Sequence, residues 1–465
     1  LILFDNQLRT LPNELGSLSQ LEMLGIEGNP MDENMRQCLI EKGTRELIMQ
    51  LRENGPGKVS DPTTSLIILT RLPVPLPPPP RQMIDIAGAT DDSESTIRVF
   101  TYNILCSKYA TKELYGYTPS NALEWEYRRE EVLQEIQSAA ADIVCLQEVD
   151  TESFREYFSM KLAYSGYKGV FWPKGRAKTM SEEKQKVVDG CATFYDSKKF
   201  VLLDKQLVDF ANIAINRSDM KNQSDIFNRV MPRDHIAIVT FFENRMDGSR
   251  LIVVNVHTFA NPAYADVKTI QTAILMEYLA KLSEKYARWP ACKDKTRYKL
   301  SSDESPQDPP EEEEEPQPSM VYSSGTALPL FVVGDFNSEK GSGVHTLLST
   351  GSISGAHPDL EGFSYGNFTR EGIVHPFSLR SAYAGLEGTV DELGWTNYTP
   401  GFTGVLDYIW YGSNCFDVKS VLGGWDKEYL TRVPGFPHWH FPSDHLSLLA
   451  EFTIRKAGRK PSAVR

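Results

Sequence analysis

From residue 97 onward, apolar residues recur with two different periods, which predict strands alternating with helices. Residues 97–105 alternate between apolar and polar positions as a half-buried strand does, and the charged stretch 125–141 has helical periodicity. Apolar runs predict buried strands at 142–149, 251–257, 330–334, 405–411 and 446–452, and the pattern over 267–285 predicts a second helix. This order of elements predicts a mixed α/β domain over 96–456, a two-layer β-sandwich of packed sheets flanked by helices.

The first thirty residues carry a different pattern, in which spaced leucines lead to an asparagine. The pattern around Asn6 returns around Asn29, 23 positions later. Leucine-rich repeats recur about every 20 to 29 residues, with leucines filling the core of a solenoid. An ordinary amphipathic segment is the alternative, but the repeat is in phase. We therefore expect 1–58 to be the C-terminal part of a leucine-rich-repeat domain with a capping helix over 32–53, and further repeats upstream, since the chain does not begin with Met.

Three other segments have compositions that oppose folding into a core. Prolines crowd 72–80, and we expect a linker over 59–95, which is a commoner role for such a stretch than binding an SH3-type partner. Residues 301–320 hold eight acids and no base, which predicts a disordered acidic insertion within the α/β domain. Residues 457–465 form a basic tail.

Composition and charge narrow the class of protein. The net charge is −13, but the acidic insertion alone contributes eight negative charges. The remainder suits an enzyme whose carboxylates bind cations, and it argues against a broad basic surface for nucleic acid. No run approaches the roughly 18 apolar residues of a membrane span. The six cysteines are scattered without a CxxC pair, which favours reduced thiols over disulfides or a zinc site.

Polar side chains follow the predicted strands where each strand ends. They are Asn103, Glu148, Asn255 with His257, Asp335 with Asn337, Asp407, and Asp444 with His445. Because neighbouring strands end at one edge of a sheet, we expect these side chains to form one site. Singly, each has an ordinary structural explanation, such as a turn cap for Asn103 or an ion pair for Glu148. Their joint occurrence favours a catalytic site.

The carboxylates of this set indicate a cation and a hydrolytic chemistry. Crowded carboxylates need a compensating positive charge, and oxygen ligands without thiolates select Mg²⁺ or Mn²⁺ over zinc, with Glu148 as the first ligand. Asp335, flanked by Asn337, could activate water for in-line attack on phosphorus. His445 could contact the phosphoryl oxygens while Asp407 fixes its tautomer and keeps it protonated.

The motifs around these residues resemble, in order, those of the exonuclease-endonuclease-phosphatase superfamily, whose fold is that of DNase I. The resemblance covers about residues 95–455 and rests on Tyr102-Asn103, Leu146-Gln147-Glu148-Val149, Asn255-x-His257, Gly334-Asp335-Phe336-Asn337, Leu406-Asp407-Tyr408 and Ser443-Asp444-His445. Finer features resemble deadenylases of the carbon catabolite repressor protein four type, catalytic subunits of the Ccr-Not complex. These features are the repeats, Asp266-Val267-Lys268 and Thr396-Asn397-Tyr398-Thr399. We expect a fungal source.

This resemblance implies a role for each residue of the set. Glu148 would be the principal magnesium ligand, with Asn103 and Asp444 nearby and one or two ions bound. Asp335 would activate the water. The remaining catalytic roles would fall to Asn337 and His257, which touch the scissile phosphate, and to the pair Asp407 and His445, which stabilises the transition state.

The same resemblance implies the reaction and the partners. The chain would be a 3′-5′ exoribonuclease that shortens the poly(A) tails of messenger RNA and releases 5′-AMP. Pro262, Asn337 and Phe402 would surround the terminal adenine, where an aromatic face can stack on the base. The repeats would dock a second deadenylase of the Pop/Caf type and, through it, the Not scaffold. The expected locations are the cytoplasm, including mRNA-decay foci, and the nucleus, with no membrane partner.

Two alternatives remain open at this point. Another enzyme of the superfamily, such as an inositol-polyphosphate phosphatase, a sphingomyelinase or an abasic-site endonuclease, would share the metal and the Asp-His pair. A mainly scaffolding leucine-rich-repeat protein would carry a degenerate nuclease domain. Degenerate members usually lose the metal-binding Glu or the final His, whereas this chain has both Glu148 and His445.

Overall fold

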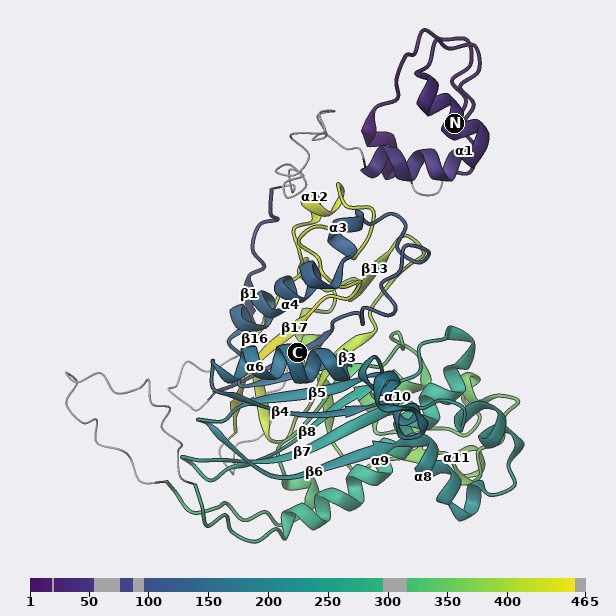
Figure 1. The fold of residues 1–465 in the computed structure, drawn as a ribbon. Helices are drawn as coiled ribbons and strands as arrows, with labels where there is room; N and C mark the ends of the chain where they lie inside the picture. The colour runs from purple at the N-terminus through teal and green to yellow at the C-terminus, as the bar shows by residue number, and fades with distance from the viewer. Residues whose placement is uncertain (19–20, 54–75, 87–95, 296–315, 456–465) are drawn as a thin grey trace, which may run out of the picture.

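The computed structural model of the 465-residue chain describes residues 1–18, 21–53, 76–86, 96–295 and 316–455. Most of the linker expected over 59–95 and of the acidic insertion expected over 301–320 lies outside these ranges, as does the basic tail 457–465. The described residues form a small N-terminal unit, purple in Figure 1, and a larger main body.

Two mixed β-sheets form the centre of the main body, and the predicted α/β fold of packed sheets with outer helices is confirmed (Figure 1). Strands β2 and β3 are parallel, as are β8 and β9, while the other neighbours are antiparallel. In spatial order the seven-stranded sheet contains β1 (Met83–Asp85), β16 (Phe416–Leu422), β17 (Leu448–Ile454), β2 (Thr96–Asn103), β3 (Ile143–Asp150), β5 (Asp189–Asp196) and β4 (Tyr167–Pro173). The six-stranded sheet contains β12 (Leu379–Ser381), β15 (Asp407–Gly412), β9 (Leu330–Asp335), β8 (Arg250–His257), β7 (Ile236–Asn244) and β6 (Phe200–Asp209).

Two short strand pairs and a set of helices complete the described structure. The strand pairs are β10 (Ser352–Ile353) with β11 (Ile373–Val374), and β13 (Asn397–Thr399) with β14 (Phe402–Gly404). The α-helices are α1 (Glu33–Glu53), α3 (Ser120–Leu123), α4 (Trp125–Ala139), α5 (Thr151–Ser153), α6 (Ser159–Ala163), α7 (Glu182–Lys186), α8 (Phe210–Asn216), α9 (Ala265–Ala287), α10 (Gly343–Thr350), α11 (Asn367–Arg370) and α12 (Lys427–Leu430). None of the helices in the described ranges combines the length and the apolar character that crossing a bilayer requires.

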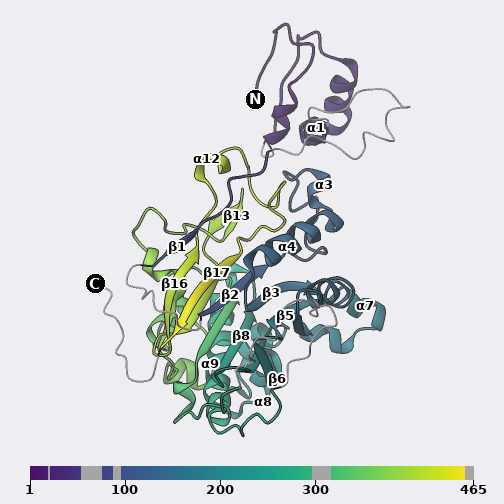
Figure 2. The ribbon, with the colours of Figure 1, turned by 90° about the vertical axis from the view of Figure 1, so that its left-hand side faces the viewer.

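Side chains on the two faces of each sheet enter different layers of the core. Val253 packs between the two sheets, whereas its neighbour Val254 packs beneath α9. Because both faces of such strands are buried, they appear in the sequence as continuous apolar runs rather than as alternating patterns. Helix α4 covers the outer face of the other sheet by packing Val132 and Ile136 against Val144 of β3. Figures 1 and 2 show α4 beside β2 and β3, and α9 beside the six-stranded sheet.

The N-terminal unit brings its two similar segments into register. Ile2 and Gly25, 23 positions apart, form a parallel bridge, and Leu3 N–H donates to the Gly25 carbonyl at 2.8 Å. The Asn29 side chain donates to the Leu3 carbonyl at 2.6 Å and accepts from Leu8 N–H at 3.1 Å, both in the first segment. It also donates to the Ile26 carbonyl of its own segment at 2.9 Å, so it bonds the backbone of both segments. The leucines of these segments pack on α1, which lies over the helix predicted for 32–53 and is interrupted at Gly43.

Residues 76–86, within the range where a linker is expected, are bound to the main body. Strand β1 pairs with β16, and the buried side chain of Arg81 donates to the Gly423 carbonyl at 2.7 Å and to Ser447 Oγ at 2.9 Å. The seven-stranded sheet therefore begins before residue 96, the start expected for the domain. Strand β1 has only three residues and follows a stretch rich in proline, so the sequence shows no strand periodicity there.

Candidate active site

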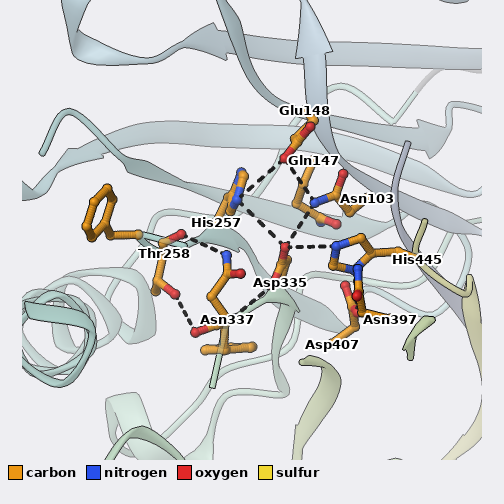
Figure 3. A network of polar contacts seen from close by, with 12 residues as sticks. Asn103, Gln147, Glu148, His257, Thr258, Asp335, Asn337, Asn397, Asp407 and His445 are labelled. Atoms are coloured by element: carbon orange, nitrogen blue, oxygen red, sulfur yellow. Dashed lines mark hydrogen bonds and ion pairs between the residues drawn. The ribbon is translucent and has the colours of Figure 1, made fainter. Parts of the chain in front are cut away.

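The ends of four central strands meet at one edge of the two sheets, as Figure 3 shows. Asn103 ends β2, His257 ends β8, Asp335 ends β9 and Asp407 begins the antiparallel β15. The strand register places Asp335 directly between His257 on one side and Asp407 on the other. The parallel pairs β2/β3 and β8/β9 thus bring side chains from distant parts of the chain to the same edge.

Irregular backbone directs several of these side chains into the site. Glu148 has φ +59° at a bulge of β3, and Asn337 has φ +48° just after β9. Such left-handed residues other than glycine are costly and cluster at functional sites. Gly334 has φ +136°, and a Cβ there would lie 2.0 Å from the Val256 carbonyl oxygen, so only glycine permits this close pairing of β8 and β9.

Asn103 links the two carboxylates at the centre of the site. Its Nδ2 donates to Asp335 Oδ2 at 2.9 Å and to Glu148 Oε1 at 3.3 Å, while its Oδ1 accepts from Leu105 N–H at 3.1 Å. His257 Nε2 lies 3.7 Å from Asp335 Oδ2 and 4.0 Å from Glu148 Oε1. The second oxygen of Glu148 accepts from Cys106 N–H at 3.0 Å. These contacts place four of the expected site residues together.

Asp407 and His445 form a buried pair next to Asp335. His445 Nδ1 lies 2.8 Å from Asp407 Oδ2, and its Nε2 lies 3.7 Å from Asp335 Oδ2 (Figure 3). Thr396 Oγ1 donates to the same Asp407 oxygen at 2.6 Å and accepts from the backbone N–H of Asp407. Thr396 is therefore a positioning residue for Asp407, for which the sequence offered only a motif and no role.

Burial and neighbouring charges perturb the pKa values of the central groups. Burial, and next the charge of Asp407, raise the pKa of Asp335 to about 7. Burial alone would lower the pKa of His445, but the carboxylates of Asp407 and Asp335 outweigh it and hold that pKa well above its usual value. Burial, followed by the charge of Lys174, lowers the pKa of His257 well below its usual value. These shifts favour the protonated form of His445 and the neutral form of His257.

Asp444 and Asn337 lie at the border of this group. Asp444 Oδ2 accepts from Tyr115 OH at 2.8 Å and from Asn397 Nδ2 at 3.3 Å, while its Oδ1 is buried without a hydrogen-bond partner. Asn337 N–H donates to Asp335 Oδ1 at 2.8 Å, and Lys268 Nζ donates to the Asn337 carbonyl at 2.6 Å. Lys268 thereby fixes the backbone that carries Asn337.

A buried ion pair beside Glu148 was not found from the sequence. Lys174 Nζ lies 2.7 Å from Asp189 Oδ2, both side chains are almost fully buried, and Arg176 and Tyr109 bond the other Asp189 oxygen. Burial raises the pKa of Glu148, and the charge of Lys174 partly counteracts this. Lys174 therefore favours the ionised form of the expected metal ligand.

The donor set suits a hard divalent cation. Asp335, Asp407 and His445 offer ligand atoms that all lie within 4.8 Å of one another, a spacing at which a metal ion could be held. Because His445 already uses Nδ1 for Asp407 and the neighbouring carboxylates favour its protonated form, we regard it as a hydrogen-bond donor rather than a ligand. The Oδ1 of Asp444 has no hydrogen-bond partner, and the carboxylate oxygens of Glu148 accept single hydrogen bonds from Asn103 and Cys106, which leaves lone pairs for a cation. Oxygen donors of this kind fit Mg²⁺ or Mn²⁺.

Pro262 and Phe402, expected around the terminal base, are at the surface. Pro262 is exposed at the start of η6 (Pro262–Tyr264), and Phe402 is 37% exposed at the start of β14. Asn337, the third expected member, is partly buried and donates from Nδ2 to the Thr258 carbonyl at 3.1 Å.

The fold and the site define the class. Residues 100–445 match the Endonuclease/Exonuclease/phosphatase family, and the chain belongs to that family. The fold is similar to that of ANGEL2, a 2′,3′-cyclic phosphatase solved with adenosine-2′,3′-vanadate, with a TM-score of 0.60 and 21% identity over 81% of this chain and 99% of that one. At this identity the likeness supports the fold alone.

Closer relatives define the branch of the family. The chain is 52% identical over 441 residues to the CCR4-Not complex 3′-5′-exoribonuclease subunit Ccr4 of Phaeosphaeria nodorum, covering 95% of this chain and 70% of that protein. It is 52% identical over 439 residues to the protein of the same name from Neurospora crassa, covering 94% and 53%. Within the family, the chain belongs with these fungal Ccr4 proteins. It spans between about half and 70% of their length.

Proposed function

We propose that the chain is a magnesium-dependent 3′-5′ exoribonuclease that shortens poly(A) tails, releases 5′-AMP and acts as a catalytic subunit of a CCR4-Not complex. The observation that carries this proposal is the buried carboxylate of Asp335, which is flanked by the Asp407–His445 pair and linked through Asn103 to Glu148. This arrangement occurs in a chain that is 52% identical to a fungal Ccr4 protein. A turn cap or a single ion pair, the structural explanations for the individual residues, would not require so many polar groups to be buried together.

In this proposal the chain's own residues handle the proton and the phosphoryl charge. Asp335 accepts a proton from the attacking water, and the N–H of Asn337 holds one carboxylate oxygen in place. Protonated His445 donates toward a phosphoryl oxygen, because Asp407 and Thr396 fix its ring. Neutral His257, at a similar distance from Asp335, donates to the same phosphate.

Glu148 is the principal magnesium ligand in this proposal, with Asn103 and Asp444 nearby. A bound Mg²⁺ would neutralise the crowded carboxylates and polarise the phosphoryl group. Asn103 currently turns its amide nitrogen toward both carboxylates, so it would have to rotate its amide to offer an oxygen to the ion. Mn²⁺ satisfies the same donor set.

Phe402→Ala is expected to separate base recognition from chemistry. Stacking is worth roughly 1 to 3 kcal/mol per base, so the variant should use A-tailed RNA about 5- to 150-fold less efficiently. Hydrolysis of a small generic phosphodiester should hardly change, because the ring is partly exposed and takes no part in proton transfer. Comparing kcat/KM for both substrates provides the measurement, with Tyr164→Ala, which removes another exposed ring, as the control. An equal loss on both substrates would instead assign Phe402 to packing of the β13–β14 pair.

The N-terminal unit is, we propose, the end of a leucine-rich-repeat domain. Its support is the parallel register of two segments 23 positions apart and the hydrogen bonds of Asn29 to the backbone of both segments. In this proposal the repeats dock a Pop/Caf-type deadenylase and thereby the Not scaffold, and the protein acts in the cytoplasm and the nucleus.

A substrate panel tests the proposed activity against its rivals. A-tailed RNA, DNA with an abasic site and a phosphoinositide are offered separately in the presence of Mg²⁺. Only the RNA is expected to be consumed. Turnover of one of the other two would favour a different activity within the family, and binding of RNA without turnover would favour the scaffolding alternative.

A further inference from the structure

Beside the candidate active site, two arginines pack against a common aromatic ring. The guanidinium carbon of Arg229 lies 4.4 Å from the ring centre of Tyr264 and 4.3 Å from that of Phe363. The guanidinium carbon of Arg233 lies 4.6 Å from the ring centres of both Tyr264 and Phe259. The rings restrict both side chains and stabilise their positive charges.

Arg229 is fully engaged within the protein. Its Nε lies 2.6 Å and its Nη2 2.7 Å from the two oxygens of Asp266, a carboxylate that is almost completely buried. The same Nη2 also donates to the Ala263 carbonyl at 3.1 Å. Arg229 is therefore a structural cation that compensates a buried acid.

Arg233 has no such partner among the described residues. No hydrogen bond or ion pair of its side chain is present there, and its Nε is buried without an acceptor. The adjacent carboxylate of Asp234 is held by Arg176 at 3.1 Å, and Asp266 is held by Arg229. A partly buried guanidinium without a partner among the described residues, next to acids that other arginines hold, is a cation available to an external anion.

The position of Arg233 connects it to the catalytic edge of the sheet. The ring of Phe259 lies 5.4 Å from that of His235, which lies 5.3 Å from that of His257. Along the chain, the exposed Pro262 lies between Phe259 and Tyr264, in the segment that directly follows His257. Arg233 is thus supported by the segment proposed to contact the terminal base, two ring contacts away from the scissile site.

We infer that Arg233 binds a phosphate of the RNA substrate other than the scissile one, as part of a subsite for the upstream backbone. This inference rests on the proposed function and adds a backbone contact to it. The planar donors of arginine match phosphate oxygens, and single-stranded nucleic acids are commonly held by cations set among aromatic rings. The rings position the guanidinium before the RNA arrives, which reduces the cost of ordering it.

Arg233→Gln tests the inference with two substrates of different length. The dinucleotide ApA has only the scissile phosphate, whereas an A-tailed RNA has many. We expect kcat/KM for the A-tailed RNA to fall on the order of tenfold, mainly through KM, and that for ApA to stay within about twofold. The plot of log K for RNA binding against log salt concentration should lose about 0.7 of its slope, the value for one phosphate of a single strand.

Matched variants keep the result interpretable. Lys281→Gln removes one exposed positive charge from α9 and should leave both quantities unchanged. Arg233→Lys keeps the positive charge but not the planar donors, so it should retain the salt slope while losing part of the affinity for RNA. This variant also tests the inference if Arg233→Gln does not fold. Equal losses on ApA and on the long RNA, or no loss on either, would overturn the inference. A wild-type protein that degrades no RNA would instead overturn the proposed function, and this inference with it.

Discussion

Replacing Asp335 by asparagine is expected to lower kcat on A-tailed RNA by about 10²- to 10⁴-fold, the usual contribution of a positioned general base. The amide keeps the volume of the side chain and can still accept from Asn337 N–H, but it cannot take a proton from water. KM should change little, since Asp335 is proposed to act on the water rather than to hold the RNA.

The stability of this variant provides its control. Burial and the charge of Asp407 raise the pKa of Asp335, so its ionised form is disfavoured in the folded protein without a cation. The asparagine variant should therefore melt no lower than the wild type in the absence of metal. Single-turnover rates together with thermal melting make the measurement. A variant with normal turnover would remove Asp335 from the proposed chemistry, whereas a melting temperature far below that of the wild type would attribute any loss to misfolding.

Glu148→Gln is expected to reduce turnover about 10³-fold or more and to weaken Mg²⁺ binding, even at saturating metal. The substitution preserves shape and leaves an oxygen to accept from Cys106 N–H, so the bulge of β3 should persist. It removes the negative charge on which a hard cation depends, and metal ions contribute several kcal/mol to such reactions.

The matched control for this variant is Glu451→Gln. Glu451 also lies in a strand of the seven-stranded sheet, and its side chain is 18% exposed compared with 15% for Glu148, but it lies in the middle of β17 and pairs with Lys419. Calorimetric titration with Mg²⁺ and the rate at saturating Mg²⁺ should distinguish the two variants. Equal metal affinity in both would argue against Glu148 as the principal ligand.

Several central strands could be predicted from the sequence because both of their faces are buried, although β5 and β7, which are also central and buried, were not predicted. The apolar runs at 142–149, 251–257 and 330–334 correspond to β3, β8 and β9 within one residue at either end. Strand β6 was not predicted, because it lies at an edge of its sheet and mixes apolar with charged residues. Pairing information, which the sequence pattern does not contain, decides such edge strands.

The site residues at strand ends could be identified because they adjoin buried apolar runs. The residues that pair with them or donate hydrogen bonds to them could not be identified. Asp335 and Glu148 interrupt or end apolar runs, which makes them visible in the sequence. Lys174 and Tyr115 sit in loops, and their partners Asp189 and Asp444 lie 15 and 329 positions away in the chain. No periodicity links such pairs, so only the folded structure reveals them.

The most direct test of the proposed activity follows the products from an RNA labelled at its 5′ end and carrying a 3′ tail of adenosines. With Mg²⁺, the wild-type protein should shorten the labelled RNA progressively from the 3′ end, accumulate 5′-AMP and slow where the tail meets other bases. Chelation of the metal should stop the reaction, and Glu148→Gln and Asp335→Asn should reproduce that arrest. Internal cleavage of the RNA, release of 3′-phosphorylated products, or undiminished shortening without a divalent cation would contradict the account.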